Sequence, residues 1–495
     1  MTRFTRRALA TATALTLLST GASAFAAEAA PETGTEIAPV TEAAPAAGTI
    51  AVQLNGQDLA FTDAAPQAKD GRTFLPFRAV FEAMGAEVSY DAAANQVSAT
   101  RGGTTVAMTL GSTEATVTAG GVTTPLTMDV APYAADNRTY VPVRFAAQAF
   151  GCAVGWDQDD STVILVDTAK LLEEARAGYT YTYLDKYLAY NERFTTGNWA
   201  MDANFNASVG LLGMGPATVA GTMTGVTAGA TQMEAAMNMK LDLQALLEGI
   251  AAMTDTASEV DAETAALLDS LKNQGIDLEL RGDLGGGTLY FTMSGDALAA
   301  AGMTAGTWYS MDLSALYGAM GMDYTALVDA SKTLDAQVLL QSAMSGVTLT
   351  DKDADYAAIA ALVDGAAKFL ADQSFTADGA NATTTYTLSQ DGADVTIGFT
   401  LVMENDAVVG YDLTMTAGTP ASADGAVPAM TMDLKTGMDA QNQMTAAFTL
   451  DMGELLSMTM DLTGGYTATD ETPALTPPEG ADVISYTDLL TGAMA

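Results

Sequence analysis

Two stretches organise this chain: Asp70-Gly-Arg-Thr-Phe-Leu-Pro-Phe-Arg78 and, 66 residues later, Asp136-Asn-Arg-Thr-Tyr-Val-Pro-Val-Arg144. Each continues into a glycine and an aspartate at the same offset. A match at one fixed period marks a repeated supersecondary unit, so we expect residues 48–168 to form one module built from two copies. The matched positions that we take as structural are Arg72/Arg138, Pro76/Pro142, Arg78/Arg144, Gly85/Gly151 and Asp91/Asp157.

The residues around each copy predict strands with a short helix between them. Asn55-Gly56 between two apolar runs is a hairpin signal. Pro76 suits the first turn of a helix, for which we expect Ala79, Val80, Ala83 and Met84 to share the buried face. Gly85 and Gly151 then follow where a helix ends in a left-handed residue. Each copy therefore reads as strands, a helix and a closing hairpin.

This twice-used phrase, preceded by Leu54-Asn-Gly56, resembles the copper amine oxidase N-terminal-like domain, a stalk module repeated on many Gram-positive surface proteins. The resemblance covers roughly residues 48–168. It implies a small α+β module of twisted antiparallel strands around helices. It does not imply copper, because the family name comes from a domain remote from any metal site and this chain has no histidine.

Arg78 and Arg144 have two interpretations. Each can clamp a ligand, or each can pair with a carboxylate such as Asp91 or Asp157 and fix the helix to the following hairpin. Repetition with the scaffold favours the structural role, since arginine often serves fixed bidentate pairing. Cys152 is the only cysteine, so no intrachain disulfide can form, and we expect it to be a small buried residue.

The first residues predict export. Arg3, Arg6 and Arg7 precede an apolar run from Ala8 to Leu18, and small residues with A-x-A spacing follow. This is the pattern of a signal peptide, which we place at residues 1–26, with a disordered Ala/Pro/Thr/Glu-rich leader at 27–47. We expect no transmembrane segment and a secreted, extracellular protein, either free or associated with the cell wall.

Charge and composition exclude several function classes. The chain has 20 Lys+Arg against 60 Asp+Glu, a formal charge of −40, so nucleic acid and anionic lipid are not expected partners. Without histidine, Ser-His-Asp or Cys-His catalysis and histidine-ligated metals are unavailable. We assign no catalytic residues, no metal and no cofactor. Asp351-Lys-Asp-Ala-Asp355 resembles a calcium loop, but Tyr356 occupies the position of its turn glycine.

The rest of the chain predicts a second domain. Residues 169–195 read as a helical connector whose tyrosines (Tyr179, Tyr183, Tyr187 and Tyr190) follow helical spacing, more typical of packing than of a carbohydrate platform. Residues 196–495 alternate like strands, interrupted by helices, and predict a larger antiparallel half-barrel-like sheet with packed helices. Their order, with Gly306-Thr-Trp-Tyr-Ser-Met-Asp-Leu-Ser314, weakly resembles the half-barrel lipoprotein carriers of the LolA/LppX type. The fold class of the whole chain is therefore α+β.

Methionine is concentrated in this second domain, often at positions two apart. In strands this spacing puts both side chains on one face, which predicts an apolar face that carries Met237, Met239, Met430, Met432, Met458 and Met460. A thioether surface for Cu(I) is one interpretation. Packing in a filled core is another, and a cavity for a lipid-like guest is a third. We expect a non-catalytic surface protein that binds an apolar molecule or a cell-envelope component, with an envelope-directed, carboxylate-dependent hydrolase as the alternative. The sequence leaves the oligomeric state open.

Overall fold

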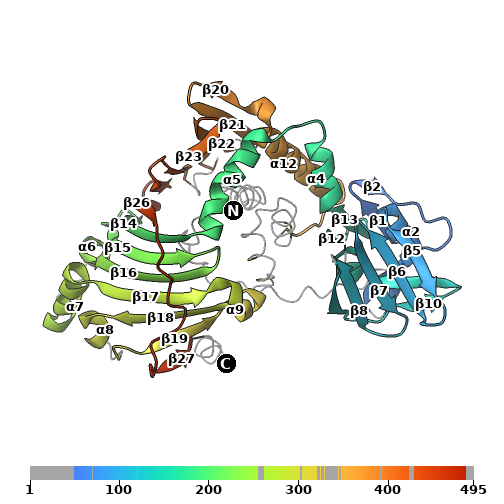
Figure 1. Ribbon diagram of the computed structural model, residues 1–495, viewed down its shortest axis with the longest axis horizontal. Coiled ribbons are helices and arrows are strands. Elements are labelled where there is room, and N and C mark those ends of the chain that lie inside the picture. The colour runs from blue at the N-terminus through green and yellow to red at the C-terminus, as the bar shows by residue number, and fades with distance from the viewer. Residues whose placement is uncertain are drawn as a thin grey trace. The chain divides into compact units, whose positions relative to one another are not determined.

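The computed structural model of the protein (Figure 1) divides into two compact units. It describes residues 50–69, 71–119, 121–148, 150–254, 261–300, 304–319, 324, 328, 344, 347–390, 393–422 and 428–486. Of the described residues, those from 50 to 178 and from 344 to 367 belong to unit 1, and those from 179 to 328 and from 368 to 486 belong to unit 2. The expected signal peptide (1–26) and leader (27–47) lie outside the described residues.

The described residues of unit 1 form three small sheets, three helices close in sequence to them and, from a distant part of the chain, most of helix α12 (Asp355–Leu370). One sheet has the order β12-β13-β1-β2, a second β10-β11-β4-β3, and a third β5-β6-β7-β8-β9. Their bounds are β1 Ala51–Leu54, β2 Gln57–Asp58, β3 Gln67–Lys69, β4 Arg72–Pro76, β5 Glu87–Asp91, β6 Gln96–Arg101, β7 Thr104–Thr109, β8 Glu114–Ala119, β9 Val122–Thr127, β10 Tyr133–Ala135, β11 Arg138–Pro142, β12 Cys152–Asp157 and β13 Thr162–Asp167. The helices are α2 Phe77–Ala83, α3 Val143–Gln148 and α4 Thr168–Arg176.

The two copies of the repeat face each other across an approximate two-fold axis. Strands β4 and β11 pair antiparallel with Leu75 opposite Val141, and these two residues occupy equivalent positions in the copies. Ion pairs repeat the symmetry: Arg72 Nε lies 2.7 Å from Asp129, and Arg138 Nε lies 2.5 Å from Asp63. Both the arginines and the aspartates are 66 residues apart. The copies therefore interact as the halves of a dimer do.

A third ion pair joins equivalent positions of unlike charge. Arg101 ends β6 of the first copy, and Asp167, 66 residues later, ends β13 of the second. Arg101 Nη1 lies 2.6 Å from Asp167 Oδ2, and the Asp167 side chain is 1% exposed. Asp167 also accepts a hydrogen bond from the backbone N–H of Lys170 and caps α4. One carboxylate therefore ties the copies together and starts the next helix.

Arg78 pairs with a carboxylate other than the one expected. Arg78 pairs with Glu82 on its own helix, at 3.1 Å, and not with Asp91. Arg144 is exposed. Asp91 and Asp157 instead accept backbone N–H groups of the turns that follow them. Short aspartate side chains favour this local bonding, which serves the hairpin without an arginine.

The buried face of α2 also differs from the expected one. Phe77, Val80, Phe81 and Met84 are buried, whereas Ala79 and Ala83 are exposed. The large side chains at i, i+3, i+4 and i+7 set the orientation of the helix, because they bury more apolar area than alanine does. The expected helix ends are confirmed: Gly85 and Gly151 have φ values of 79° and 71°. Pro76 is the residue before α2 and closes β4.

Residues from the distant 344–367 region complete unit 1. Trp156 N–H in β12 donates to the Leu349 carbonyl at 3.1 Å, and Asp157 accepts the Lys352 backbone N–H at 3.0 Å. Leu349 and helix α12 (Asp355–Leu370) bury Ile164 and Val166 of β13 in one apolar cluster. The sequence placed this region within residues 196–495. All six residues of β13 are buried, so the strand needs cover on both faces.

Unit 2 is built on one 14-stranded sheet that curls like a half-barrel (Figure 1). Its order is β20-β21-β22-β23-β24-β25-β26-β14-β15-β16-β17-β18-β19-β27. The strands are β14 Asn198–Leu211, β15 Ala217–Ala228, β16 Gln232–Asp242, β17 Ile276–Asp283, β18 Thr288–Ser294, β19 Trp308–Asp312, β20 Thr376–Asp378, β21 Asn381–Gln390, β22 Ala393–Glu404, β23 Ala407–Thr419, β24 Met430–Met438, β25 Gln443–Asp451, β26 Leu456–Ala468 and β27 Val483–Ser485. Its helices include α5 Thr182–Thr196, α6 Gln244–Thr254, α7 Ala262–Asn273, α8 Asp296–Ala300 and α9 Leu313–Ala319, with short turns η1 Leu284–Gly286 and η2 Asp372–Ser374.

The segment between β26 and β27 crosses strands β14 to β19 and closes the sheet edge (Figure 1). Ala474 N–H donates to Glu234 on β16, and Arg281 on β17 donates to the Thr476 carbonyl. Trp308 N–H donates to the Asp482 carbonyl, after which β27 pairs parallel with β19. This order confirms an α+β fold with an antiparallel, half-barrel-like second sheet.

Candidate functional site

The strand register puts all six predicted methionines on one face of the 14-stranded sheet. Residues directly opposite each other in a sheet share a face, so the pairs can be followed from strand to strand. Met239 and Met237 of β16 lie opposite Gly221 and Met223 of β15. Gly221 in turn lies opposite Phe205 of β14, which lies opposite Leu462 of β26. Met460 and Met458 share the face of Leu462 because they precede it by two and four residues, and they lie opposite Phe448 and Leu450 of β25. Leu450 lies opposite Met432 of β24, and Met430, two residues earlier, is on the same face, opposite Thr419 of β23. We call this surface the methionine face.

The opposite face is polar and exposed. Thr459 and Thr431 alternate with the methionines and are exposed, and Asn238 donates to Asp277 on the next strand. Threonines and a serine line up across several strands, as in Thr449, Thr459, Ser208 and Thr218. This alternation is what an antiparallel sheet with one solvated face requires. The methionine face is therefore the inner face of the half-barrel.

One end of the methionine face is closed by aromatic side chains of α5. The Tyr187 ring lies 5.1 Å from Phe399 and 5.3 Å from Tyr411, and Phe194 lies 5.7 Å from Tyr466. Burial raises the pKa of Tyr466 to about 12 and that of Tyr411 further above its ordinary value. These phenols therefore stay neutral at physiological pH. Tyr187 and Tyr190 of α5 pack against Tyr411, in agreement with the packing role that their helical spacing predicted.

The other end of the face is only half-buried. The six methionines are all half-buried, whereas Met201, Met223, Met438 and Met444 are buried. Met237 lies directly opposite the buried Met223, and the other five lie farther from the aromatic end along their strands. Their neighbours on the face share this intermediate exposure: Val209, Val219, Leu241, Ile276, Leu278, Phe448, Leu450 and Leu462. Burial along the strands thus falls from the aromatic end to the methionine end. Methionine adapts its shape to a neighbour, so this half of the face can accommodate an apolar molecule.

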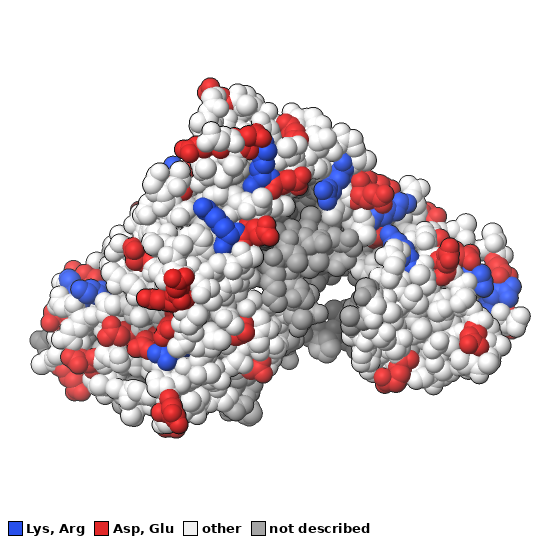
Figure 2. Space-filling model, in the orientation of Figure 1, with Lys and Arg blue, Asp and Glu red and all other residues white. Residues whose placement is uncertain are grey.

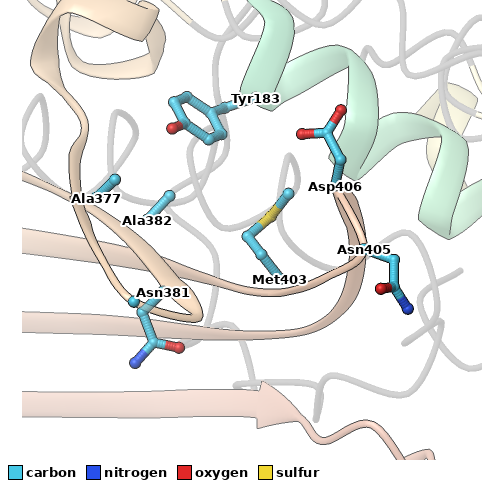
Figure 3. Close-up of a pocket in the computed structure, with 8 residues that line it drawn as sticks. Tyr183, Ala377, Asn381, Ala382, Met403, Asn405 and Asp406 are labelled. Carbon is cyan, nitrogen blue, oxygen red and sulfur yellow. The ribbon is translucent and has the colours of Figure 1, made fainter.

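A small pocket lies beside α5 at another place in unit 2 (Figure 3). It has a volume of about 270 Å³ and is lined by Tyr183, Ala377, Gly379, Asn381, Ala382, Met403, Asn405 and Asp406. Lys186 Nζ lies 2.5 Å from Asp406 Oδ1, so the carboxylate is already paired. Asp406 is 86% exposed, which leaves its charge in water. The pocket is smaller than a typical ligand cleft and has no pair of groups arranged for catalysis among its lining residues.

Many of the described acidic residues serve turns. Asp351, Asp439, Asp283 and Asp451 each accept a backbone N–H two residues further along the chain. Asp351 begins the segment that resembles a calcium loop, so its carboxylate has a structural partner. The residues that the structure describes contain no group of three or more Cys, Asp and Glu that could hold a metal ion. The chain has no histidine to ligate copper, and its single cysteine, Cys152, is buried.

No helix in the described part of the chain has both the length and the hydropathy needed to cross a membrane. Residues 53–165 match the family model of the copper amine oxidase N-terminal domain. The match confirms the resemblance predicted from the repeat, and this domain type is a non-catalytic, stalk-type module. A search of curated proteins found no match to the chain. The likeness of unit 2 to LolA/LppX-type carriers stays a prediction.

Proposed function

We propose that the protein is an exported, non-catalytic binding protein in which the stalk-type module presents unit 2, and unit 2 binds an apolar, lipid-like molecule on its methionine face. The observation that carries the proposal is the gradient of burial along that face. Aromatic side chains fill one end, whereas the methionines at the other end keep part of their surface exposed. A face of this kind gains free energy when an apolar molecule covers it.

The chemistry of the face sets the class of ligand. Its half-buried end presents thioether and aliphatic groups, so the part of a bound molecule that lies on it is hydrocarbon. The polar groups of the sheet point the other way, as Thr459 does beside Met458. A fatty acyl or isoprenoid chain meets these conditions. Export follows from the signal-peptide pattern of residues 1–26, and the hydrolase alternative finds no supporting arrangement among the described residues.

Titration with a fluorescent fatty acid tests the proposal. We expect saturable binding to the full chain, and we expect Met458→Gln with Met460→Gln to weaken it by about tenfold, because polar side chains replace two apolar contacts. Thr459→Gln is the matched control: it changes the neighbouring residue on the opposite face and should leave binding unchanged. A filled core predicts no saturable binding at all, and that result would refute the proposal.

A second measurement identifies the natural ligand. Organic extracts of the protein purified from its source should contain a stoichiometric lipid by mass spectrometry. Mild peroxide should oxidise the half-buried Met237 and Met458 before the buried Met223 and Met438, and bound lipid should slow that reaction.

A further inference from the structure

The half-buried end of the methionine face finishes in a cluster of exposed apolar side chains, which we call the apolar rim. It consists of Leu211, Leu212, Leu455, Ile250 and Met253, which are 41%, 56%, 44%, 42% and 63% exposed. They come from three segments: the end of β14 with the turn that follows it, the turn before β26, and helix α6. Large apolar side chains gathered on a surface usually mark a binding site.

Contacts join the three segments into one surface. Leu212 N–H donates to the Leu455 carbonyl at 3.1 Å, which fixes the two turns side by side. Helix α6 lies against the first turn, because a Cβ added at Gly249 would come within 2.7 Å of the Met214 Cβ. The three segments of the rim therefore lie next to one another at one edge of unit 2.

The backbone at Leu212 gives an independent indication of function. Its φ is 53°, and Gly213 follows with φ 70°, as in the tight turns that favour Asn-Gly. Other turns of this chain use that chemistry: Asn55-Gly56 has φ values of 48° and 71°. A leucine in this left-handed conformation is strained, and here it is also exposed. Strain retained at an exposed site, where folding gains nothing from the side chain, is typical of functional positions.

The rim continues the methionine face without a break. Met460 lies opposite Ala207, Met458 opposite Val209, and Leu456 opposite Leu211. The next residue beyond Leu211 is Leu212 at the tip of the turn, and the residue before Leu456 is Leu455. A molecule that moves along the face toward this end reaches the rim.

We propose that the apolar rim inserts into the surface of a lipid bilayer whose headgroups carry no net charge, and that the apolar ligand passes there between the bilayer and the methionine face; this rests on the proposed function. The rim exposes apolar side chains from two turns and a helix, and exposed apolar groups of this kind suit insertion into the surface of a bilayer.

Charge favours a bilayer without net charge over the two other candidates for binding the rim, a second copy of the chain and an anionic bilayer. Glu454 stands next to Leu455, Glu248 lies on α6, and the chain carries a formal charge of −40. Figure 2 shows acidic side chains spread over the visible surface, with few Lys and Arg between them. A second copy would bring the same acidic groups together, and an anionic bilayer would repel them. A zwitterionic bilayer carries no net charge and therefore does not repel these acidic groups.

Flotation of the full chain with phosphatidylcholine vesicles tests the proposal. Leu212→Asn suits the left-handed turn and removes the apolar side chain, so this variant should stay folded and lose about tenfold in vesicle binding. Leu126→Thr, which removes a 39% exposed leucine from β9 in unit 1, should bind like the unaltered protein. Vesicles rich in phosphatidylglycerol should bind more weakly.

Unchanged binding of Leu212→Asn to phosphatidylcholine vesicles would overturn the proposal. A second result would also overturn it: the unaltered protein sediments as a dimer, Leu212→Asn sediments as a monomer, and neither binds vesicles. The rim would then contact a second copy of the chain. Fatty-acid titration without vesicles separates the two proposals. Leu212→Asn should still bind the fluorescent fatty acid saturably, because it leaves the methionine face unchanged. If the unaltered chain does not bind the fatty acid, the proposed ligand site is refuted, and vesicle flotation still tests the membrane contact of the rim separately.

Discussion

Individual residues show how the two copies of the repeat depend on each other. Arg138 of the second copy donates two hydrogen bonds to Asp63 of the first. These hydrogen bonds hold the pKa of the Asp63 carboxyl below its ordinary value of 3.8. Because the folded pKa is lowered, the pair stabilises the fold above the unfolded pKa, and this contribution is lost as the pH falls through the folded value.

Replacing Arg138 should therefore change the titration of Asp63. We expect Arg138→Gln to raise the pKa of Asp63 toward 3.8, measured by NMR of its side-chain carbonyl carbon between about pH 2 and 6. Arg72→Gln is the control, because Arg72 pairs with Asp129 and should not move the Asp63 titration. An Asp63 pKa that is the same with and without Arg138 would contradict the assigned pairing.

The buried pair Arg101–Asp167 should matter more to stability than the exposed pairs. Arg101→Met leaves the 1% exposed Asp167 carboxylate without its cation, which should cost about 3 kcal/mol in the free energy of unfolding. Arg72→Met, in an exposed pair, should cost less than about 1 kcal/mol. Urea denaturation followed by circular dichroism measures both. Equal losses from the two variants would show that burial does not set the strength of these pairs.

At the scale of elements, local signals predicted much of the structure. Asn55-Gly56 forms its turn, Gly85 and Gly151 end their helices, and the i, i+2 methionines share a face. Long-range features were harder to predict. Arg101 and Asp167 occupy equivalent positions of the two copies but are different residue types. A comparison of the copies that looks for identical residues therefore does not find this pair. The apolar run Thr162-Val-Ile-Leu-Val-Asp167 indicates a strand that is buried on both faces. It does not indicate which segments of the chain pack against those faces.

Leu349 provides part of that cover, and its removal should destabilise unit 1. Its side chain is 2% exposed and packs with Ile164 and Val166 of β13. We expect Leu349→Ala to lower the free energy of unfolding by about 3 kcal/mol, because it removes buried apolar contacts and leaves a cavity. Leu126→Ala, at a 39% exposed leucine, should change it by less than about 0.5 kcal/mol. A loss at Leu349 as small as at Leu126 would show that the 347–350 segment does not contribute to the core.

At the scale of the whole molecule, the stalk-type module is not complete in one stretch of sequence. The family match ends at residue 165, and the 66-residue period predicts a folded monomer for residues 48–168. In the full chain, however, Ile164 and Val166 are 1% and 0% exposed, because side chains of α4 and of residues 344–367 pack on them. The fragment would expose both side chains and the edge of β12 that Leu349 covers. Exposed strand edges and apolar strands promote association.

We therefore expect the 48–168 fragment to fold with mixed α/β circular dichroism and to self-associate in sedimentation velocity. A fragment of residues 48–178 supplies α4 and should associate less, and adding a peptide of residues 344–367 should restore a monomer with a higher melting temperature, because binding to the folded state stabilises it. A scrambled peptide of the same composition should have no effect. If 48–168 is monomeric at every concentration and the 344–367 peptide leaves its melting temperature unchanged, the module is complete in the repeat and the distant segment only rests on it.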